Sequence, residues 1–290
     1  MTSAKFRALV WKHYRLEGRH NLPWRKTKDV YKILVSEVML QQTQVERVIP
    51  FYTKFIKKFP TAKKLAAAPL SEVLKSWQGL GYNRRAKMLR AAAQVLARKK
   101  VNSVAELEAL PGVGPYTARA VAAFAWNEDV IFIETNIRTA IIHHFFSRPA
   151  ETSSARSARA ARPILHLAKD VSAAHVSDAE IIKILEKTLP KGKSREWYSA
   201  LMDYGAYLKR SGISHNARSS KYAKQSKFAG SLREVRGAIL RALANTSVTE
   251  SALRKLLPAK RATQIDTALK ALLKEDLIKK QKGKYALAEE

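Results

Sequence analysis

The sequence of 290 residues predicts a mainly α-helical protein that ends in a small separate domain. Apolar residues recur three and four positions apart along most of the chain, and alternating strand patterns are scarce before residue 231. Turn-forming residues divide the helical runs into short segments. They lie at Pro23, Pro50, Pro60, Pro69, Gly79, Gly81, Pro111, Gly112 and Gly114. We therefore expect many short helices over residues 1–230.

The composition is ordinary for a globular chain, but the charge is not. Hydrophobic residues make up 46% and charged residues 27% of the sequence, which argues against disorder over the whole chain. Lys and Arg (54) exceed Asp and Glu (24) by 30, and such an excess repels itself unless a polyanion neutralises it. The charge predicts nucleic acid as the partner.

Two absences exclude further classes of function. The sequence contains no cysteine, which excludes disulfides, thiolate catalysis and any cysteine-ligated iron–sulfur cluster. No apolar run reaches the roughly 18 residues that span a bilayer, and the N-terminal segment lacks the apolar core of a secretion signal. We expect an intracellular protein, and both the bacterial cytosol and the eukaryotic nucleus fit.

A glycine hairpin is the clearest local motif. Residues 110–118 read LPGVGPYTA and lie between an expected helix at 103–109 and another at 116–126. Gly112 and Gly114 allow a tight turn with N–H groups that point outward, and the second helix adds the positive end of its dipole. This arrangement is typical of helix-hairpin-helix motifs, which bind the DNA backbone without reading bases.

A first unusual carboxylate is Glu37. It precedes a row of amides in the segment SEVMLQQTQV at 36–45, where a continuous helix would place Glu37 and Gln41 on one face. A capping or surface role stays open as the alternative.

A second carboxylate, Glu134, follows the apolar run VIFI at 130–133 and precedes a new helix. Because burial of an unpaired charge costs several kcal/mol, Glu134 must reach a cleft or find partners. Asn136 and Arg138 are near enough to serve. A helix N-cap is the alternative role, and it is compatible with a functional one.

Two basic segments follow. Residues 147–163 are rich in Ser, Ala and Arg and read as a basic insertion, either a surface loop or a poorly ordered helix. Residues 204–233 contain seven basic residues and no acidic one, which predicts a strip that binds a nucleic-acid backbone. The seven are Lys209, Arg210, Arg218, Lys221, Lys224, Lys227 and Arg233.

The C-terminal segment has a different pattern. Helical runs at 234–244, 250–257 and 263–275 precede two short apolar-polar stretches that flank a turn at 282–284. Three helices and a basic hairpin resemble a winged helix, in which the third helix enters the major groove and the wing touches phosphates. Protein–protein contact is the alternative use.

Six segments, taken in order, resemble the helix-hairpin-helix superfamily of base-excision DNA glycosylases, and most closely the MutY-type adenine DNA glycosylases. The segments are Pro23–Arg25, Ser36–Val45, Trp77–Tyr82, Leu110–Ala118, Glu134–Asn136 and Met202–Ala206.

The resemblance implies a mainly α, helix-hairpin-helix DNA glycosylase fold over residues 1–230, with two helical subdomains and a cleft between them. One subdomain would span 22–130 and carry the hairpin. Residues 1–21 and 131–230 would form the other, and residues 231–290 the winged-helix-like domain.

The resemblance also implies roles for single residues. Glu37 matches the acid that protonates the departing adenine and assists water. Glu134 matches a second carboxylate, normally Asp, that stabilises the cationic sugar. Asn136 and Tyr116 match residues that orient the carboxylates and the water.

Further residues are expected to contact DNA. Gln41, Gln42 and Tyr82 match side chains that wedge into the base stack and fill the gap left by the flipped nucleotide. The remaining expected DNA-binding residues are Arg25, Gly112, Val113, Gly114, Thr117, Lys221, Lys224 and Lys227.

Tyr116 bears on the reaction type. Relatives that resemble endonuclease III carry a Lys there, which forms a Schiff base and leads to strand cleavage. With Tyr116 the resemblance implies a monofunctional hydrolase that leaves an abasic site.

We expect a monomer that excises adenine opposite guanine or 8-oxoguanine in duplex DNA. No metal or cofactor is expected, apart from a monovalent cation at the hairpin 110–115.

Three departures from the family pattern keep alternatives open. Most members hold an iron–sulfur cluster with four cysteines, whereas this chain has none. Glu134 stands in place of Asp, and a winged-helix-like segment replaces a domain that recognises 8-oxoguanine. Excision of thymine or uracil from mispairs with guanine is one alternative. A DNA-binding relative without catalysis is the other.

Overall fold

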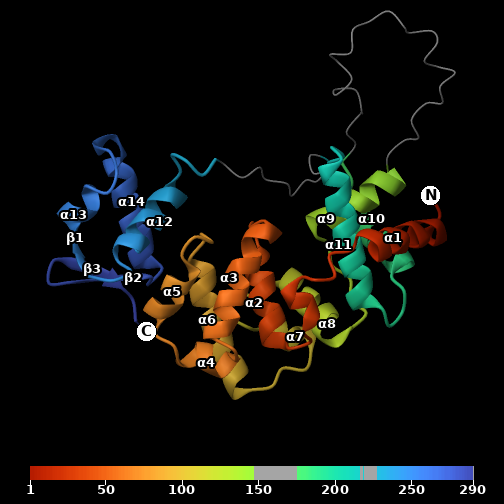
Figure 1. The fold of residues 1–290 in the computed structure, drawn as a ribbon, viewed down its shortest axis with the longest axis horizontal. Helices are drawn as coiled ribbons and strands as arrows, with labels where there is room; N and C mark the ends of the chain where they lie inside the picture. The colour runs from red at the N-terminus through yellow and green to blue at the C-terminus, as the bar shows by residue number, and fades with distance from the viewer. Residues whose placement is uncertain (147–174, 216–217, 219–226, 290) are drawn as a thin grey trace, which may run out of the picture. The chain divides into compact units, whose positions relative to one another are not determined.

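Helices dominate the computed structural model, which describes residues 1–146, 175–215, 218 and 227–289 (Figure 1). The basic insertion 147–163, Lys221 and Lys224 lie outside the described residues. The predicted mainly α class is confirmed. No helix in the described part combines the length and apolarity needed to cross a bilayer.

The chain forms two compact units. The first comprises Met1–His20 with Asn127–Lys224, and the second comprises Asn21–Trp126 with Gln225–Glu290. The divisions fall close to the expected ones at 21/22 and 130/131. The C-terminal segment, expected as a domain of its own, belongs to the same compact unit as the helices before residue 127.

The first unit contains α1 (Ser3–Glu17), α9 (Thr135–Ile141), η2 (Ile142–Phe146), α10 (Asp178–Thr188) and α11 (Ser194–Arg210). Its core is aromatic: Trp197 and Tyr198 are fully buried, and Phe6 packs edge-on against Trp197. Tyr198 also stacks on Phe132 at 3.9 Å between ring centroids and donates to the carbonyl of Val130 at 2.7 Å. These contacts fix the extended chain that leads into α9.

The second unit is built around α2 (Val30–Leu40), which is buried at nearly every position from Tyr31 to Met39 and is mostly apolar. The helices around it are η1 (Pro23–Lys26), α3 (Val45–Lys58), α4 (Ala62–Ala67), α5 (Leu70–Trp77), α6 (Arg84–Arg98), α7 (Val104–Glu108) and α8 (Pro115–Trp126).

The C-terminal segment is a winged helix in its order of elements. It contains α12 (Leu232–Ala242), β1 (Val248–Thr249), α13 (Glu250–Arg254), η6 (Ala259–Arg261), α14 (Ala262–Lys274), β2 (Ile278–Gln281) and β3 (Lys284–Leu287). The three predicted helical runs and the hairpin are confirmed. Lys282 and Gly283 both have positive φ, as a two-residue hairpin turn requires.

The sheet has one strand that the sequence pattern does not predict. The strand order is β1-β3-β2, all antiparallel, and β1 pairs Val248 with Tyr285 and Thr249 with Lys284. Two residues are too short a run to show a period of two. Tyr285 and the apolar residues of α12 and α14 join the core of the second unit.

The winged-helix segment is attached to α5 and α6 by specific polar contacts. The N–H of Leu70 donates to the carbonyl of Glu289 at 3.0 Å. Lys87 Nζ donates to the carbonyl of Glu275 at 2.8 Å and pairs with the carboxylate of Asp276 at 3.0 Å. The continuous core and these contacts explain why residues 225–290 share one unit with residues 21–126.

Candidate active site

Glu37 lies on α2 in the middle of the second unit and is only 6% exposed. A carboxylate so deeply buried requires partners, because desolvation of its charge is costly. One partner is Tyr116 in the first turn of α8, whose hydroxyl donates to Oε2 of Glu37 at 3.3 Å. The structure thus brings together two predicted catalytic residues that are 79 positions apart.

The glycine hairpin places Tyr116 beside α2. The turn between α7 and α8 closes through the N–H of Val113, which donates to the carbonyl of Leu110 at 3.1 Å. Gly112 has φ +75° and lies so close to Met88 that a Cβ at residue 112 would be 2.5 Å from the Cβ of Met88. Only glycine fits there, because both the backbone and the space exclude a side chain.

Other hairpin residues present backbone rather than side chain. Gly114 and Gly112 are exposed, and nothing lies within 4 Å of a Cβ placed on Gly114. The side chains of Val113 and Thr117, both expected to contact DNA, are buried, at 7% and 3% exposed. Any contact that these two residues make with a phosphate would therefore use their N–H groups.

The segment after Glu37 corrects the expectation of a continuous helix over 36–45. Helix α2 ends at Leu40, and Gln41 is its C-cap with a non-helical ψ of 115°. Gln42 is exposed with φ +56°, and α3 begins only at Val45. Gln41 still turns toward the hairpin, because its Nε2 donates to Oγ1 of Thr117 at 3.4 Å.

The third expected wedge residue, Tyr82, lies on a loop between α5 and α6. Its φ is +47°, and Gly79 and Gly81, which precede it, also have positive φ. The loop is therefore a strained turn that displays one aromatic ring.

Arg85 joins the two loops that carry the expected wedge residues, a role that no sequence motif indicates. Its Nη1 donates to the carbonyls of Val38 and Gln41 at 2.6 Å each, and its Nη2 donates to that of Gly81 at 3.2 Å. The guanidinium also lies over the rings of Trp77 and Tyr82, and burial lowers the pKa of Arg85 to about 10. Since Arg85 binds carbonyls from segments distant in sequence, only the structure shows it.

Glu134 lies in the first unit, as the N-cap of α9. Its Oε2 accepts from the N–H of Asn136 at 2.6 Å, and its Oε1 accepts from the side chains of Thr135 at 2.6 Å and Asn136 at 3.3 Å. Asn136 is thus a partner of Glu134, as expected. Arg138 is not among these partners: it forms an ion pair with Asp178 at 2.6 Å.

Lys209 on α11 brings a positive charge near Glu134. Its Nζ donates to Oγ1 of Thr135 at 3.1 Å. Burial lowers the pKa of Lys209, and the carboxylate of Glu134 acts in the opposite direction. Lys209 was predicted only as one member of a basic strip.

Helix α11 approaches α9 closely because of Gly205. A Cβ at residue 205 would be 2.0 Å from the carbonyl oxygen of Asn136. Two positions earlier, the buried carboxylate of Asp203 accepts from the backbone N–H of Arg19 at 2.8 Å and from its Nε at 2.6 Å. The segment Met202–Ala206 therefore supports the backbone that carries Glu134 and Asn136.

Two further residues, Arg25 and Lys227, are expected to bind DNA. Arg25 lies in η1 and is partly buried, and Lys227 is exposed just before α12. Within the residues that the structure describes, no three His, Asp or Glu side chains gather as a metal site would require.

Comparison with known proteins identifies the family. The family model described as "HhH-GPD superfamily base excision DNA repair protein" matches residues 35–166. An adenine DNA glycosylase of Mycolicibacterium smegmatis is 36% identical over 288 residues, which is 94% of this chain and 93% of that protein. An adenine DNA glycosylase of Buchnera aphidicola is 41% identical over 149 residues, but this match covers only 42% of that protein's length.

Solved structures show the same fold. A thermostable thymine-DNA glycosylase matches with a TM-score of 0.56 and 25% identity, over 76% of this chain and 96% of that one. Endonuclease III in a trapped covalent intermediate with DNA matches with a TM-score of 0.51 and 21% identity, over 73% of this chain and 87% of that one, which supports the fold alone. With a relative that is similar over nearly its whole length, the chain belongs to the adenine DNA glycosylases of the HhH-GPD superfamily of base excision DNA repair proteins.

Proposed function

We propose that this protein is a monofunctional DNA glycosylase that flips adenine out of a mispair in duplex DNA and hydrolyses its N-glycosidic bond. The observation that carries the proposal is the buried Glu37 with the hydroxyl of Tyr116 on its Oε2. The M. smegmatis relative, which is named an adenine DNA glycosylase and matches along nearly its whole length, favours adenine as the base.

The mechanism uses one proton donor and one anion. Glu37 gives a proton to a ring nitrogen of adenine, the bond from the sugar C1′ to N9 breaks, and the electron pair leaves with the neutral base. The sugar is left as an oxocarbenium cation, which the carboxylate of Glu134 stabilises. Water then adds to C1′ and returns a proton to Glu37. Tyr116 and Asn136 position the two carboxylates.

Tyr116 also supports the monofunctional assignment. A phenol cannot condense with the C1′ aldehyde of an abasic site, whereas a lysine at this place could form a Schiff base. Treatment with borohydride during turnover should therefore trap little covalent protein–DNA adduct. Strong trapping would contradict this part of the proposal and would point to another amine.

We propose duplex DNA with a mispair as the substrate, a monomer as the active form and a monovalent cation at the hairpin 110–115. The exposed backbone at Gly112 and Gly114 supports a phosphate contact there. Exchange of potassium for tetramethylammonium at constant ionic strength should weaken DNA binding. Sedimentation of the protein with DNA should give a one-to-one complex.

A second candidate is excision of thymine or uracil from mispairs with guanine. The match to a thymine-DNA glycosylase, which covers 96% of that chain, favours it. Duplexes with each mispair, incubated with enzyme and then cleaved with alkali, separate the candidates. Cleavage at adenine opposite guanine or 8-oxoguanine is the expected result, and cleavage only at thymine or uracil would overturn the proposal. Binding without any cleavage would indicate a relative that has lost catalysis.

A further inference from the structure

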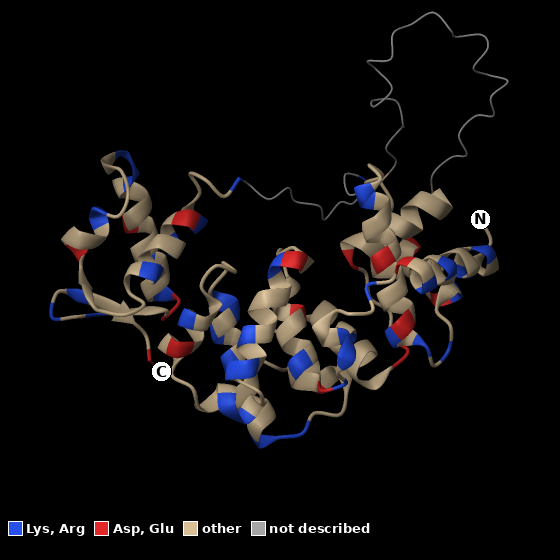
Figure 2. Ribbon diagram, viewed as in Figure 1, with Lys and Arg blue, Asp and Glu red and all other residues tan. Residues whose placement is uncertain are grey.

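The second unit contains a large pocket on the side of the wedge residues. Its volume is about 1010 Å³, and its walls come from the end of α2, the loop 78–82, the start of α6, the glycine hairpin and α12. Six arginines and one carboxylate, that of Glu275, line it. Helix α6 itself carries five basic residues and no acidic one (Figure 2). The pocket is therefore large enough for a nucleotide and has the charge that attracts a phosphate.

Helix α12 of the winged-helix segment touches a wedge residue directly. Arg233 Nη1 donates to the hydroxyl of Tyr82 at 3.3 Å, and the guanidinium lies 5.5 Å from the centre of the Tyr82 ring. Arg85 lies over the same ring at 5.4 Å. Two guanidinium groups, one from α6 and one from α12, therefore contact the ring of Tyr82.

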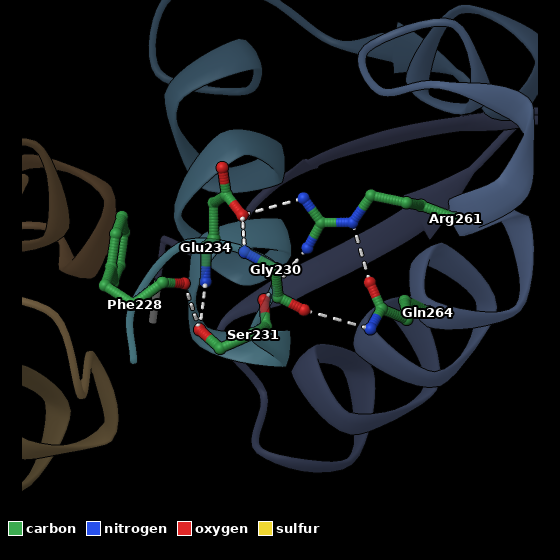
Figure 3. Close-up of polar contacts among 6 residues, drawn as sticks. All are labelled: Phe228, Gly230, Ser231, Glu234, Arg261 and Gln264. Atoms are coloured by element: carbon green, nitrogen blue, oxygen red, sulfur yellow. Dashed lines mark hydrogen bonds and ion pairs between the residues drawn. The ribbon is translucent and has the colours of Figure 1, made fainter. Parts of the chain in front are cut away.

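The start of α12 is itself held firmly (Figure 3). Ser231 caps the helix, and Arg261 donates to Oε2 of Glu234 at 2.7 Å and to the carbonyl of Ser231 at 3.1 Å. Gln264 donates to the carbonyl of Gly230 at 3.2 Å and accepts from Arg261 at 2.7 Å. Arg233 is thus presented from a rigid helix end, as a positioning residue must be.

The next turn of α12 is fixed as well. Arg236, one turn after Arg233, forms a two-pronged pair with Glu275, with distances of 2.9 and 2.6 Å. Glu275 also accepts from Lys87 of α6 through its carbonyl. The pocket wall formed by α12 is therefore tied to α6, and Tyr82 lies on the loop that leads into α6.

The position of the wedge decides what the pocket can bind. A side chain that fills the place of a flipped nucleotide stands next to the base that was paired with it. The residues around that side chain therefore surround the orphaned base and its phosphates.

We propose that this pocket binds the orphaned nucleotide of the strand opposite the excised base, and that Arg233 is a specificity-determining positioning residue that sets Tyr82 against it. This inference rests on the proposed base flipping. The winged-helix segment would then take part in recognising the opposite base through α12. This role does not depend on what the β2–β3 hairpin contacts.

The test compares Arg233→Ala with Arg254→Ala, an arginine of the same segment whose ion pairs with Glu250 and Asp266 are exposed. Both variants lose one positive charge, and thermal unfolding checks that both are folded. The probes are duplexes with a tetrahydrofuran abasic analogue opposite guanine, 8-oxoguanine or cytosine, and dissociation constants are measured for each. A second duplex set carries 2-aminopurine as the orphaned base, because its fluorescence reports stacking against Tyr82.

We expect Arg233→Ala to weaken binding by about 3- to 30-fold, the range of a cation–π contact with a hydrogen bond. We also expect it to reduce the affinity ratios among the three opposite bases and the 2-aminopurine quenching, while Arg254→Ala changes neither. Arg233→Lys should keep the salt dependence and lose part of the base discrimination. Unchanged ratios and quenching in folded Arg233→Ala would overturn the inference, as would equal losses in both alanine variants.

These readouts are separate from the proposed reaction, because the abasic analogue cannot be hydrolysed. A wild-type protein that releases no adenine but discriminates the opposite base through Arg233 would refute the proposed function alone. A protein that releases adenine with unaltered discrimination in Arg233→Ala would refute only this inference.

Discussion

The hydroxyl of Tyr116 donates a hydrogen bond of 3.3 Å to Oε2 of Glu37, a carboxylate that is 6% exposed. The contact joins the first turn after the glycine hairpin to the central helix of its unit. The glycine hairpin, which is expected to bind DNA, and a candidate general acid are thereby joined within one compact unit.

Replacement Tyr116→Phe tests this contact. We expect the single-turnover rate of base release to fall roughly 3- to 10-fold, since a hydrogen bond contributes about 0.5–1.5 kcal/mol, with unchanged affinity for an abasic analogue. Tyr31→Phe is the control, because Tyr31 also lies on α2 but donates to the carbonyl of Phe59, away from the site. Equal rate losses in the two variants would show that the effect is structural.

Replacement Glu134→Asp tests the departure from the family pattern. Asp is a good N-cap, so the shorter side chain should still accept from the N–H of Asn136. We expect excision at an unchanged or higher rate. A complete loss of excision would mean that the pocket is shaped for the longer carboxylate.

The sequence predicted the elements near the site better than the contacts within it. The hairpin glycines, the helices around them and the three helical runs of the C-terminal segment follow from local patterns. The pairing of Glu37 with Tyr116 was implied only by family resemblance. The role of Arg85 was not implied at all, because its partners are carbonyls of Val38, Gln41 and Gly81, which leave no signature in a sequence.

One expectation from periodicity was wrong for an instructive reason. The segment 36–45 has no proline or glycine, so its pattern favours one helix, yet α2 ends at Leu40. Arg85 stabilises this helix end, because it donates to the carbonyls of Val38 and Gln41. Tertiary contacts thus override local helix propensity.

Replacement Gly205→Ala should destabilise the first unit severely. The added methyl would meet the carbonyl oxygen of Asn136 at 2.0 Å, so α9 and α11 must separate. We expect a loss of about 1–3 kcal/mol or more, seen as a lower midpoint in urea. Gly237→Ala on α12 is the matched control: its Cβ would meet nothing closer than 3.5 Å, and a helical Gly→Ala change is expected to stabilise by about 0.5–1 kcal/mol. An unchanged midpoint for Gly205→Ala would contradict the close packing.

The stability of the first unit should depend on pH through His144. Burial lowers the pKa of this histidine from 6.5 to about 4, and its Nε2 lies 2.7 Å from the hydroxyl of Tyr204. Between these two pH values the unfolded chain binds more protons than the folded chain, so the unfolding free energy decreases as the pH falls. Burial lowers the pKa values of His143 and His215 as well, which acts in the same direction.

Urea unfolding at about pH 7.5 and about pH 5 measures this effect. We expect a lower midpoint at the acidic pH, and a smaller decrease in His144→Gln than in the wild type. An identical decrease in the two proteins would assign the acid sensitivity to other groups.

The most direct test of the proposed reaction is the release of free adenine from a duplex with adenine opposite 8-oxoguanine, in a single turnover, by the wild type and by Glu37→Gln. The amide keeps the shape of the carboxyl group but cannot donate its proton. We expect free adenine from the wild type and a rate lower by about 10²- to 10⁴-fold in Glu37→Gln, with unchanged affinity for the abasic analogue. Glu46→Gln, at an exposed position of α3, should behave as the wild type. Adenine released by Glu37→Gln at the wild-type rate, or none released by the wild type, would contradict the proposed reaction.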